Sequence, residues 1–257
     1  MTRMMNLSRS SIRNAFAVAA AVPTLGLGAA ALAAVLTLVL PSAALAKRSP
    51  SGSRIYPTTA KPFGETYAAW SAHWWQWALA IPPVSGVHPF IADPAFQCDV
   101  NQSGPVWFLG APLGDPAERS CAIPADTAVV VGLLNAECSD LEGLGTTEAE
   151  QRDCANFFAN HIVDLFATLD GNVVAGLSSF RFVSSQFTFT APTPWIFGPT
   201  GGSGTAVSDG YFLMLKPLSS GTHTLHFGGA FHFSVAEGDP FDFDAALDMT
   251  YELTLEE

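Results

Sequence analysis

The stretch YAAWSAHWWQWALAI, residues 67–81, decides how the rest of the chain must fold. It holds four of the six tryptophans. One set of side chains recurs at steps of three and four residues, the spacing of one face of a helix: Tyr67, Trp70, Trp74, Trp77 and Ile81. Two prolines follow, and proline ends a helix because it has no N–H to donate. The sequence therefore predicts a helix whose aromatic face is buried against the rest of the domain.

The N-terminus has the pattern of an export signal. Arg3, Arg9 and Arg13 precede a long apolar run over residues 15–40, and the small residues 44–46 resemble a cleavage site. We expect residues 1–46 to be a signal peptide; the alternative is an uncleaved anchor, because the run is long enough to span a bilayer. The mature protein is then secreted, extracellular or periplasmic, with no further contact with the membrane. We expect residues 47–61 to be a flexible N-terminus and residues 62–257 a single domain.

The chain is strongly acidic, with a formal net charge of −12. Without the predicted signal it has eight basic and 23 acidic residues, a net charge of −15. Such a chain repels phosphate backbones, which argues against nucleic acid as a partner. No cofactor is expected. The one candidate is calcium at an acidic cluster near the C-terminus, where a solvated surface is the simpler interpretation: Asp239, Asp242, Asp244 and Asp248.

All four cysteines lie after the predicted cleavage site, and an even number in an exported chain predicts disulfides. Three pairings exist. We favour Cys98–Cys121 and Cys138–Cys154 because each closes a short loop, and we expect each to contribute about 2–4 kcal/mol.

The remaining periodicity is mostly that of strands. Short apolar or alternating runs bounded by Gly and Pro occur over residues 106–109, 127–134, 210–215, 222–235 and 242–255. The pair Gly228-Gly229 predicts a bulge within one of them. A second helix begins at the capping box Thr147-x-x-Glu150, and its apolar stripe continues to Leu169. The fold class is therefore mainly β, a β-rich α+β protein. We expect a single-domain sandwich, jelly-roll-like, with two flanking helices.

Several motifs together resemble an uncharacterised family of exported bacterial proteins. They are W-x-x-x-W-W-x-W at residues 70–77, GPVWFL at 104–109, CAIP at 121–124 and P-L-x-x-G-x-H-x-L-x-F at 217–227. The resemblance covers nearly all of the predicted mature chain. It implies export and a bacterial source, but no activity and no functional residues.

Two tryptophans are candidates for ligand contact. Trp75 lies about 100° around the helix from Trp74, off the buried stripe. Trp195 lies in a loop rich in Gly and Pro. An exposed ring at either position would suit stacking against a sugar. His73, on the same helix and near Glu65 and Gln76, is a candidate for acid–base chemistry, with a half-exposed histidine as the simpler interpretation.

Glu137, Asp209 and Arg181 are polar residues inside or beside apolar strands. Such residues are either hydrogen-bonded supports or site residues, and a salt bridge between Arg181 and one of the acids is the simpler interpretation. His223, His226 and His232 are weak metal candidates. In one strand His226 and His232 share a face, while His223 points the other way, unless the bulge breaks this parity.

These features favour a non-enzymatic role, that of an extracellular binding or surface protein with carbohydrate or another extracellular protein as its partner. The first alternative is a secreted hydrolase that uses carboxylate and histidine groups. The second is a structural subunit of an extracellular assembly, with the aromatic helix as its interface. An exposed row of Trp rings would favour sugar binding or assembly, and a cleft lined by the candidate polar residues would favour an enzyme.

Overall fold

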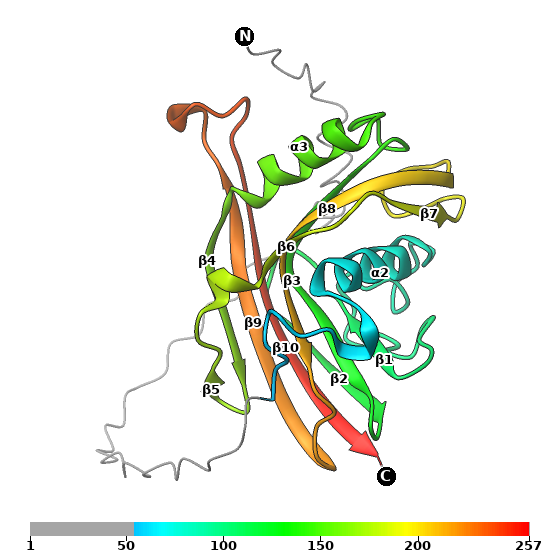
Figure 1. Cartoon of the computed structure of the whole chain (residues 1–257), viewed down its shortest axis with the longest axis vertical. Helices are drawn as coiled ribbons and strands as arrows, with labels where there is room; N and C mark the ends of the chain where they lie inside the picture. Colours follow the sequence, from blue (N-terminus) through cyan, green and yellow to red (C-terminus); the bar gives the residue numbers. More distant parts are fainter. Residues whose placement is uncertain (1–53, 257) are drawn as a thin grey trace, which may run out of the picture.

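The computed structural model describes residues 54–256 as two packed β-sheets with two α-helices (Figure 1). The predicted mainly β sandwich is therefore confirmed. The predicted signal peptide, residues 1–46, and the first part of the predicted flexible segment lie outside the described residues. Within residues 54–256, no helix has the length and apolarity needed to cross a bilayer.

The first sheet has the strand order β1-β3-β8-β6, and β7 also pairs with β8. Its strands are β1 (Val106–Leu109), β3 (Ala128–Ser139), β6 (Arg181–Val183), β7 (Phe187–Ala191) and β8 (Gly202–Leu215). The second sheet has the order β2-β10-β9-β4-β5. Its strands are β2 (Ala117–Pro124), β4 (Ile162–Leu169), β5 (Asn172–Val173), β9 (Gly221–Phe233) and β10 (Phe243–Glu256). Two pairs, β1–β3 and β2–β10, are parallel, so both sheets are mixed.

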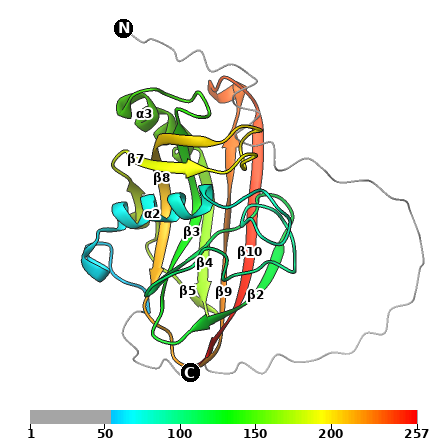
Figure 2. The ribbon, with the colours of Figure 1, turned by 90° about the vertical axis from the view of Figure 1, so that its right-hand side faces the viewer.

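Helix α2 (Tyr67–Leu79) is the predicted aromatic helix, and it lies across the outer face of the first sheet (Figure 2). The Thr66 hydroxyl accepts the Ala69 N–H at its start, as expected of an N-cap. Of the five residues in the predicted stripe, four are buried and Trp70 is half-buried, which confirms a core role for this face. The Nε1–H groups of Trp74 and Trp77 donate to the carbonyls of Leu109 and Val100.

Helix α3 (Glu148–Ala159) closes one end of the core between the sheets (Figure 1). The predicted capping box of Thr147 and Glu150 is present. The predicted length is wrong, because the helix ends at Ala159 and the second half of the stripe is strand β4. Ile162 and Val163 are β-branched, which favours a strand, and β4 gains its hydrogen bonds from β9. Gly171 is left-handed as predicted, but it forms the β4–β5 turn together with Asp170.

The bulge predicted at Gly228-Gly229 of β9 is also wrong, because the bulge lies in the neighbouring strand β4. β9 pairs with β10 without interruption, and the extra residue lies in β4, between Val163 and Phe166. A side chain at Gly228 would meet the Leu247 carbonyl at 2.2 Å, so close backbone approach accounts for the glycine.

Both predicted disulfides are present, Cys98–Cys121 and Cys138–Cys154, and they indicate an oxidising compartment. The described part of the predicted flexible segment is anchored to the first sheet. Tyr56 donates its N–H to the Met214 carbonyl, and Arg54 accepts the Lys216 N–H. Within residues 54–256 the chain also forms three short 3-10 turns: η2 (Pro62–Gly64), η3 (Leu177–Phe180) and η4 (Val235–Glu237).

Candidate functional site

A bulge in β3 turns polar side chains toward α2. Before it, Ala128 and Val130 belong to the apolar cluster beneath α2. Gly132 then faces Phe212 of β8, and Asn135 faces Gly210, so β3 advances three residues while β8 advances two. In an unbroken strand Asn135 and Glu137 would face the other sheet. The extra residue turns them to the side that faces α2.

Gly210 makes this bulge sterically feasible. Its φ of 146° lies in a region that favours glycine, and a Cβ there would lie 2.3 Å from the Asn135 Cα. The β3 predicted from sequence stopped at Leu134. The structure continues it to Ser139, so Asn135 and Glu137 are strand residues on a buried face.

A cavity of about 110 Å³ lies beside this part of β3. Strand β1 ends at Leu109, opposite Val131, so among the described residues no strand pairs with β3 on that side beyond this point. Because that edge of β3 is open, the cavity reaches both the core between the two sheets and the apolar cluster between α2 and the first sheet. Its walls include aromatic rings from α2, α3 and two loops: Trp74, Trp75, Phe90, Phe158 and Phe197. Its polar lining consists of Asn135, Glu137 and Glu142.

The polar atoms on this cavity lack partners within the described chain. In residues 54–256, six buried side-chain N or O atoms have no hydrogen bond, and four of them belong to cavity residues. These four are Trp75 Nε1, Asn135 Oδ1 and both carboxyl oxygens of Glu137. Most buried polar groups in proteins are hydrogen-bonded, so a cluster of exceptions marks a place where a ligand or solvent supplies the partners.

The carboxyl groups of Glu137, which is buried, and Glu142, which is half-buried, are close enough to form a pair. Burial raises the pKa of Glu137 well above its ordinary value, and the nearby carboxyls of Glu142 and Asp140 raise it further. Burial also raises the pKa of Glu142, but less, because the neighbouring Glu137 carboxyl and the Ser139 hydroxyl favour its ionised form. The Ser139 Oγ–Glu142 Oε2 distance is 2.7 Å. The pair therefore retains a proton, mainly on Glu137, at pH values where an exposed glutamate is fully ionised.

A buried arginine holds two walls of the cavity. Arg119 donates from Nη1 to the carbonyls of Pro89 and Gly110 at 3.0 and 3.1 Å. It donates from Nη2 to the Ile91 carbonyl at 2.9 Å. The Pro89 and Ile91 carbonyls are on either side of Phe90, and the Gly110 carbonyl precedes Ala111. Phe90 and Ala111 both line the cavity. Arg119 therefore fixes the two loops that carry these residues.

His88 holds the same wall from within. It is fully buried, and its Nδ1 accepts the Phe90 N–H at 3.1 Å. Burial lowers the pKa of His88 to about 3, and the positive charge of Arg119 also lowers it. A neutral His88 is therefore part of the framework that positions Phe90.

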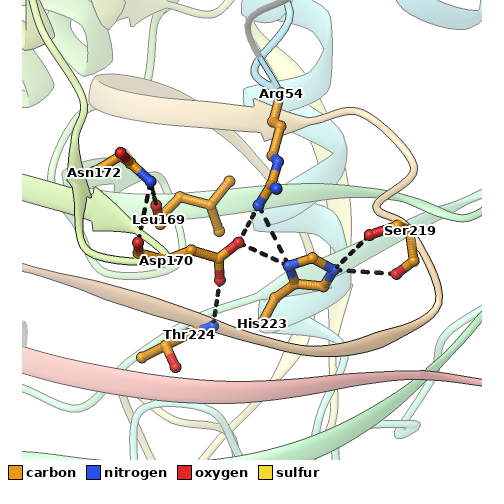
Figure 3. Close-up of polar contacts among 7 residues, drawn as sticks. All are labelled: Arg54, Leu169, Asp170, Asn172, Ser219, His223 and Thr224. Atoms are coloured by element: carbon orange, nitrogen blue, oxygen red, sulfur yellow. Dashed lines mark hydrogen bonds and ion pairs between the residues drawn. The ribbon is translucent and has the colours of Figure 1, made fainter. Parts of the chain in front are cut away.

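A second polar cluster connects the β4–β5 and β8–β9 turns (Figure 3). His223 Nδ1 lies 2.8 Å from Asp170 Oδ2, and Nε2 lies 3.2 Å from the Ser219 hydroxyl. Arg54 also pairs with Asp170. Partial burial raises the pKa of Asp170, but hydrogen bonds from His223, Thr224 and Arg54 outweigh it and leave this pKa below its ordinary value. The order Asp–His–Ser is that of a catalytic triad. However, Nε2 also lies 3.0 Å from the Ser219 carbonyl, which suits a role in fixing the turn.

The structure brings two of the predicted site residues, Trp75 and Glu137, onto one cavity. Trp195 is buried, stacks on Phe189, and reaches the cavity only through Phe197. Trp75 and Trp195 are each only 4% exposed, so neither offers an open face for stacking.

The other predicted residues lie elsewhere. His73 contacts Glu65 and Gln76, as expected, on a separate surface groove beside Trp70. Arg181 forms a two-point salt bridge with the fully buried Asp209, at 2.9 and 2.7 Å. This salt bridge confirms the simpler interpretation for that pair.

The three histidines of β9 contact different carboxylates: Asp170 for His223, Asp248 for His226 and Asp244 for His232. In the acidic cluster near the C-terminus, Asp239 contacts His161, and Asp242 accepts the Val235 N–H. In the part of the chain that is described, no group of three or more His, Cys, Asp or Glu side chains is placed to hold a metal ion.

Glu142 is the acidic residue of the cavity that the sequence did not reveal. It lies in the loop after β3, five residues beyond Glu137, and no local pattern marks it. A search for acids shortly after a predicted site acid would have found it, together with Asp140. Comparison of the chain with known protein families, characterised proteins and solved structures finds no match.

Proposed function

We propose that this is an extracellular, non-enzymatic binding protein that takes a small molecule into the cavity beside β3. One observation carries the proposal: four buried polar atoms without partners belong to residues that line one cavity with mostly apolar walls. A buried polar group without a hydrogen bond costs about 1–3 kcal/mol. A ligand that supplies the missing partners recovers this free energy, and an apolar pocket with a few convergent polar groups is the usual form of a small-molecule site.

The cavity size favours a compact ligand. A cavity of roughly 150 Å³ with apolar walls holds benzene, and this one is smaller, about 110 Å³. A short aliphatic body, or at most one small ring, therefore fits better than an extended chain. Carbohydrate stays in the range of ligands to be tested, but a sugar would have to enter the cavity, since Trp75 and Trp195 are buried.

Export supports an extracellular site. The two disulfides need an oxidising compartment, and residues 1–46 have the pattern of a signal peptide. The assembly hypothesis is less well supported, because the aromatic face of α2 is covered by the chain itself.

A calorimetric screen of small amines, alcohols, acids and monosaccharides tests the proposal. The wild type is compared with Leu113→Trp, which fills the cavity from a half-buried position, and with Glu118→Gln, on the exposed side of β2. We expect ligands that bind the wild type and Glu118→Gln equally and bind Leu113→Trp at least 10-fold more weakly. Equal binding by all three proteins, or binding by none, would refute the proposal.

A secreted hydrolase is the second candidate, favoured by the contacts from Asp170 through His223 to Ser219 (Figure 3). In that role His223 would accept the Ser219 hydroxyl proton. A fluorophosphonate probe tests it directly. Labelling that Ser219→Ala abolishes would support a nucleophilic serine, and labelling of neither protein would leave the cluster a structural link between two turns.

A further inference from the structure

We propose that the ligand of the cavity beside β3 is a small organic cation, a primary amine that carries one ring or a short aliphatic body. This inference rests on the function proposed above and adds the chemical class of the ligand. It follows from three properties of the cavity: the kind of hydrogen-bonding atoms, the sign of the charges and the character of the walls.

The unpartnered atoms mostly accept hydrogen bonds. Three of the four are oxygens, Asn135 Oδ1 and the two carboxyl oxygens of Glu137, which all accept once Glu137 is ionised; only Trp75 Nε1 is a donor in every state. An ammonium group has three donors and no acceptor, so it can satisfy these oxygens together. A ligand rich in acceptors would leave them without partners.

The charges around the cavity have one sign. Among the described residues that line it, none is Lys, Arg or His, while Glu137 and Glu142 are both acids. Asp140 adds a third carboxyl close enough to act on Glu137. Two basic residues contact the wall loops, and both bind backbone groups: Arg119 donates to carbonyls, and His88 accepts an N–H. A carboxylate ligand would meet like charge at short range, whereas a cation would gain from every acid nearby.

The walls suit a cation with an apolar body. Trp74, Trp75, Phe90 and Phe197 bring a connected cluster of aromatic rings to the cavity wall on the side of α2. A cation within about 6 Å of such a ring is attracted to its face, most strongly by tryptophan. The apolar body of the ligand would contact the aliphatic and aromatic wall that lies away from Glu137.

Binding of a cation also changes the protonation of the acids. The carboxyl pair retains a proton because burial disfavours a charge on Glu137 and the neighbouring carboxyl groups repel it. An ammonium group beside Glu137 stabilises the ionised pair, so the proton leaves to the buffer as the ligand enters. Each bound amine then releases up to one proton, and the neutral alcohol of the same shape releases none.

Isothermal titration calorimetry with matched probes tests the inference. The probes are isobutylamine, isobutanol and 3-methylbutanoate, which suit a cavity of about 110 Å³ and are titrated in two buffers of different ionisation enthalpy. The variants are Glu137→Gln/Glu142→Gln and, as a matched control, Glu118→Gln/Glu252→Gln, which removes two exposed acids from β2 and β10. Circular dichroism and thermal unfolding of each variant verify that it is folded.

We expect the amine to bind the wild type and the control at least 10-fold more tightly than the alcohol, with proton release. We expect the Glu137→Gln/Glu142→Gln protein to lose this preference and the proton release. If the alcohol binds as tightly as the amine, or the carboxylate binds more tightly than either, the inference that the ligand is a cation is wrong, but the proposed binding function stands. If no probe binds the wild type, both proposals are overturned.

Discussion

Acidification tests the role of His88 in holding the wall of the cavity. In the folded protein His88 is fully buried and neutral, with a pKa of about 3. In the unfolded chain its pKa returns to about 6.5. Below pH 6.5 the unfolded state therefore binds a proton that the folded state does not. The stability from a neutral His88 is complete above pH 6.5 and is lost progressively as the pH falls toward 3.

The magnitude follows from the difference of about 3.5 pKa units. Each unit is worth about 1.4 kcal/mol, so the whole loss is about 5 kcal/mol, of which about 2 kcal/mol is lost by pH 5. Between pH 7 and 5 the Glu137–Glu142 pair acts in the opposite direction, because its raised pKa values favour folding as protons are added. This contribution is common to the wild type and to a variant at position 88, so the difference between the two isolates the histidine.

The variant is His88→Asn, whose Oδ1 can replace Nδ1 as the acceptor of the Phe90 N–H. Urea unfolding followed by tryptophan fluorescence gives the free energy of unfolding at pH 7, 6 and 5. We expect the wild type to lose about 2 kcal/mol more than His88→Asn over this range. Equal losses in the two proteins would show that His88 is protonated in the folded state, and the reasoning about its burial would be refuted.

Three further substitutions test the framework of the site. Arg181→Ala leaves Asp209 buried without its salt bridge, and we expect a loss of about 3–5 kcal/mol in urea unfolding; a loss below 1 kcal/mol would contradict the pairing. Cys154→Ser opens a 16-residue loop, and we expect a loss of about 3 kcal/mol in urea unfolding, with a larger loss on reduction of the wild type, which opens both disulfides; unchanged stability would contradict the pairing. Gly132→Ala places a Cβ 2.5 Å from the Trp74 ring, so we expect a loss of about 1–3 kcal/mol and weaker ligand binding, and unchanged stability would mean that the ring is free to move.

The parts of the fold that depend on neighbours in sequence were predictable. Helix α2 follows from apolar spacing and from the prolines after it, and the start of α3 follows from its capping box. The disulfides follow from the rule that short loops close most readily. The end of α3 did not follow, because residues 162–169 keep a helical spacing while their hydrogen-bond partners come from β9, far along the chain.

The cavity was predictable only in part. Glu137 stood out in the sequence because it is a charged residue just after an apolar run. Trp75 stood out because it lies off the apolar stripe of its helix. Their meeting depends on the bulge in β3, and an unbroken apolar run over residues 128–134 has no alternation in which an extra residue would show. Glu142 reaches the cavity by the return of a loop, which no periodicity encodes.

A crystal structure of the wild-type protein with isobutylamine shows whether the cavity takes a cation. We expect the amine in the cavity beside β3, with its nitrogen within hydrogen-bond distance of Glu137 and its methyl groups against Trp74 or Trp75. A cavity that contains only ordered water, in crystals where the amine is bound elsewhere on the surface, would contradict this expectation.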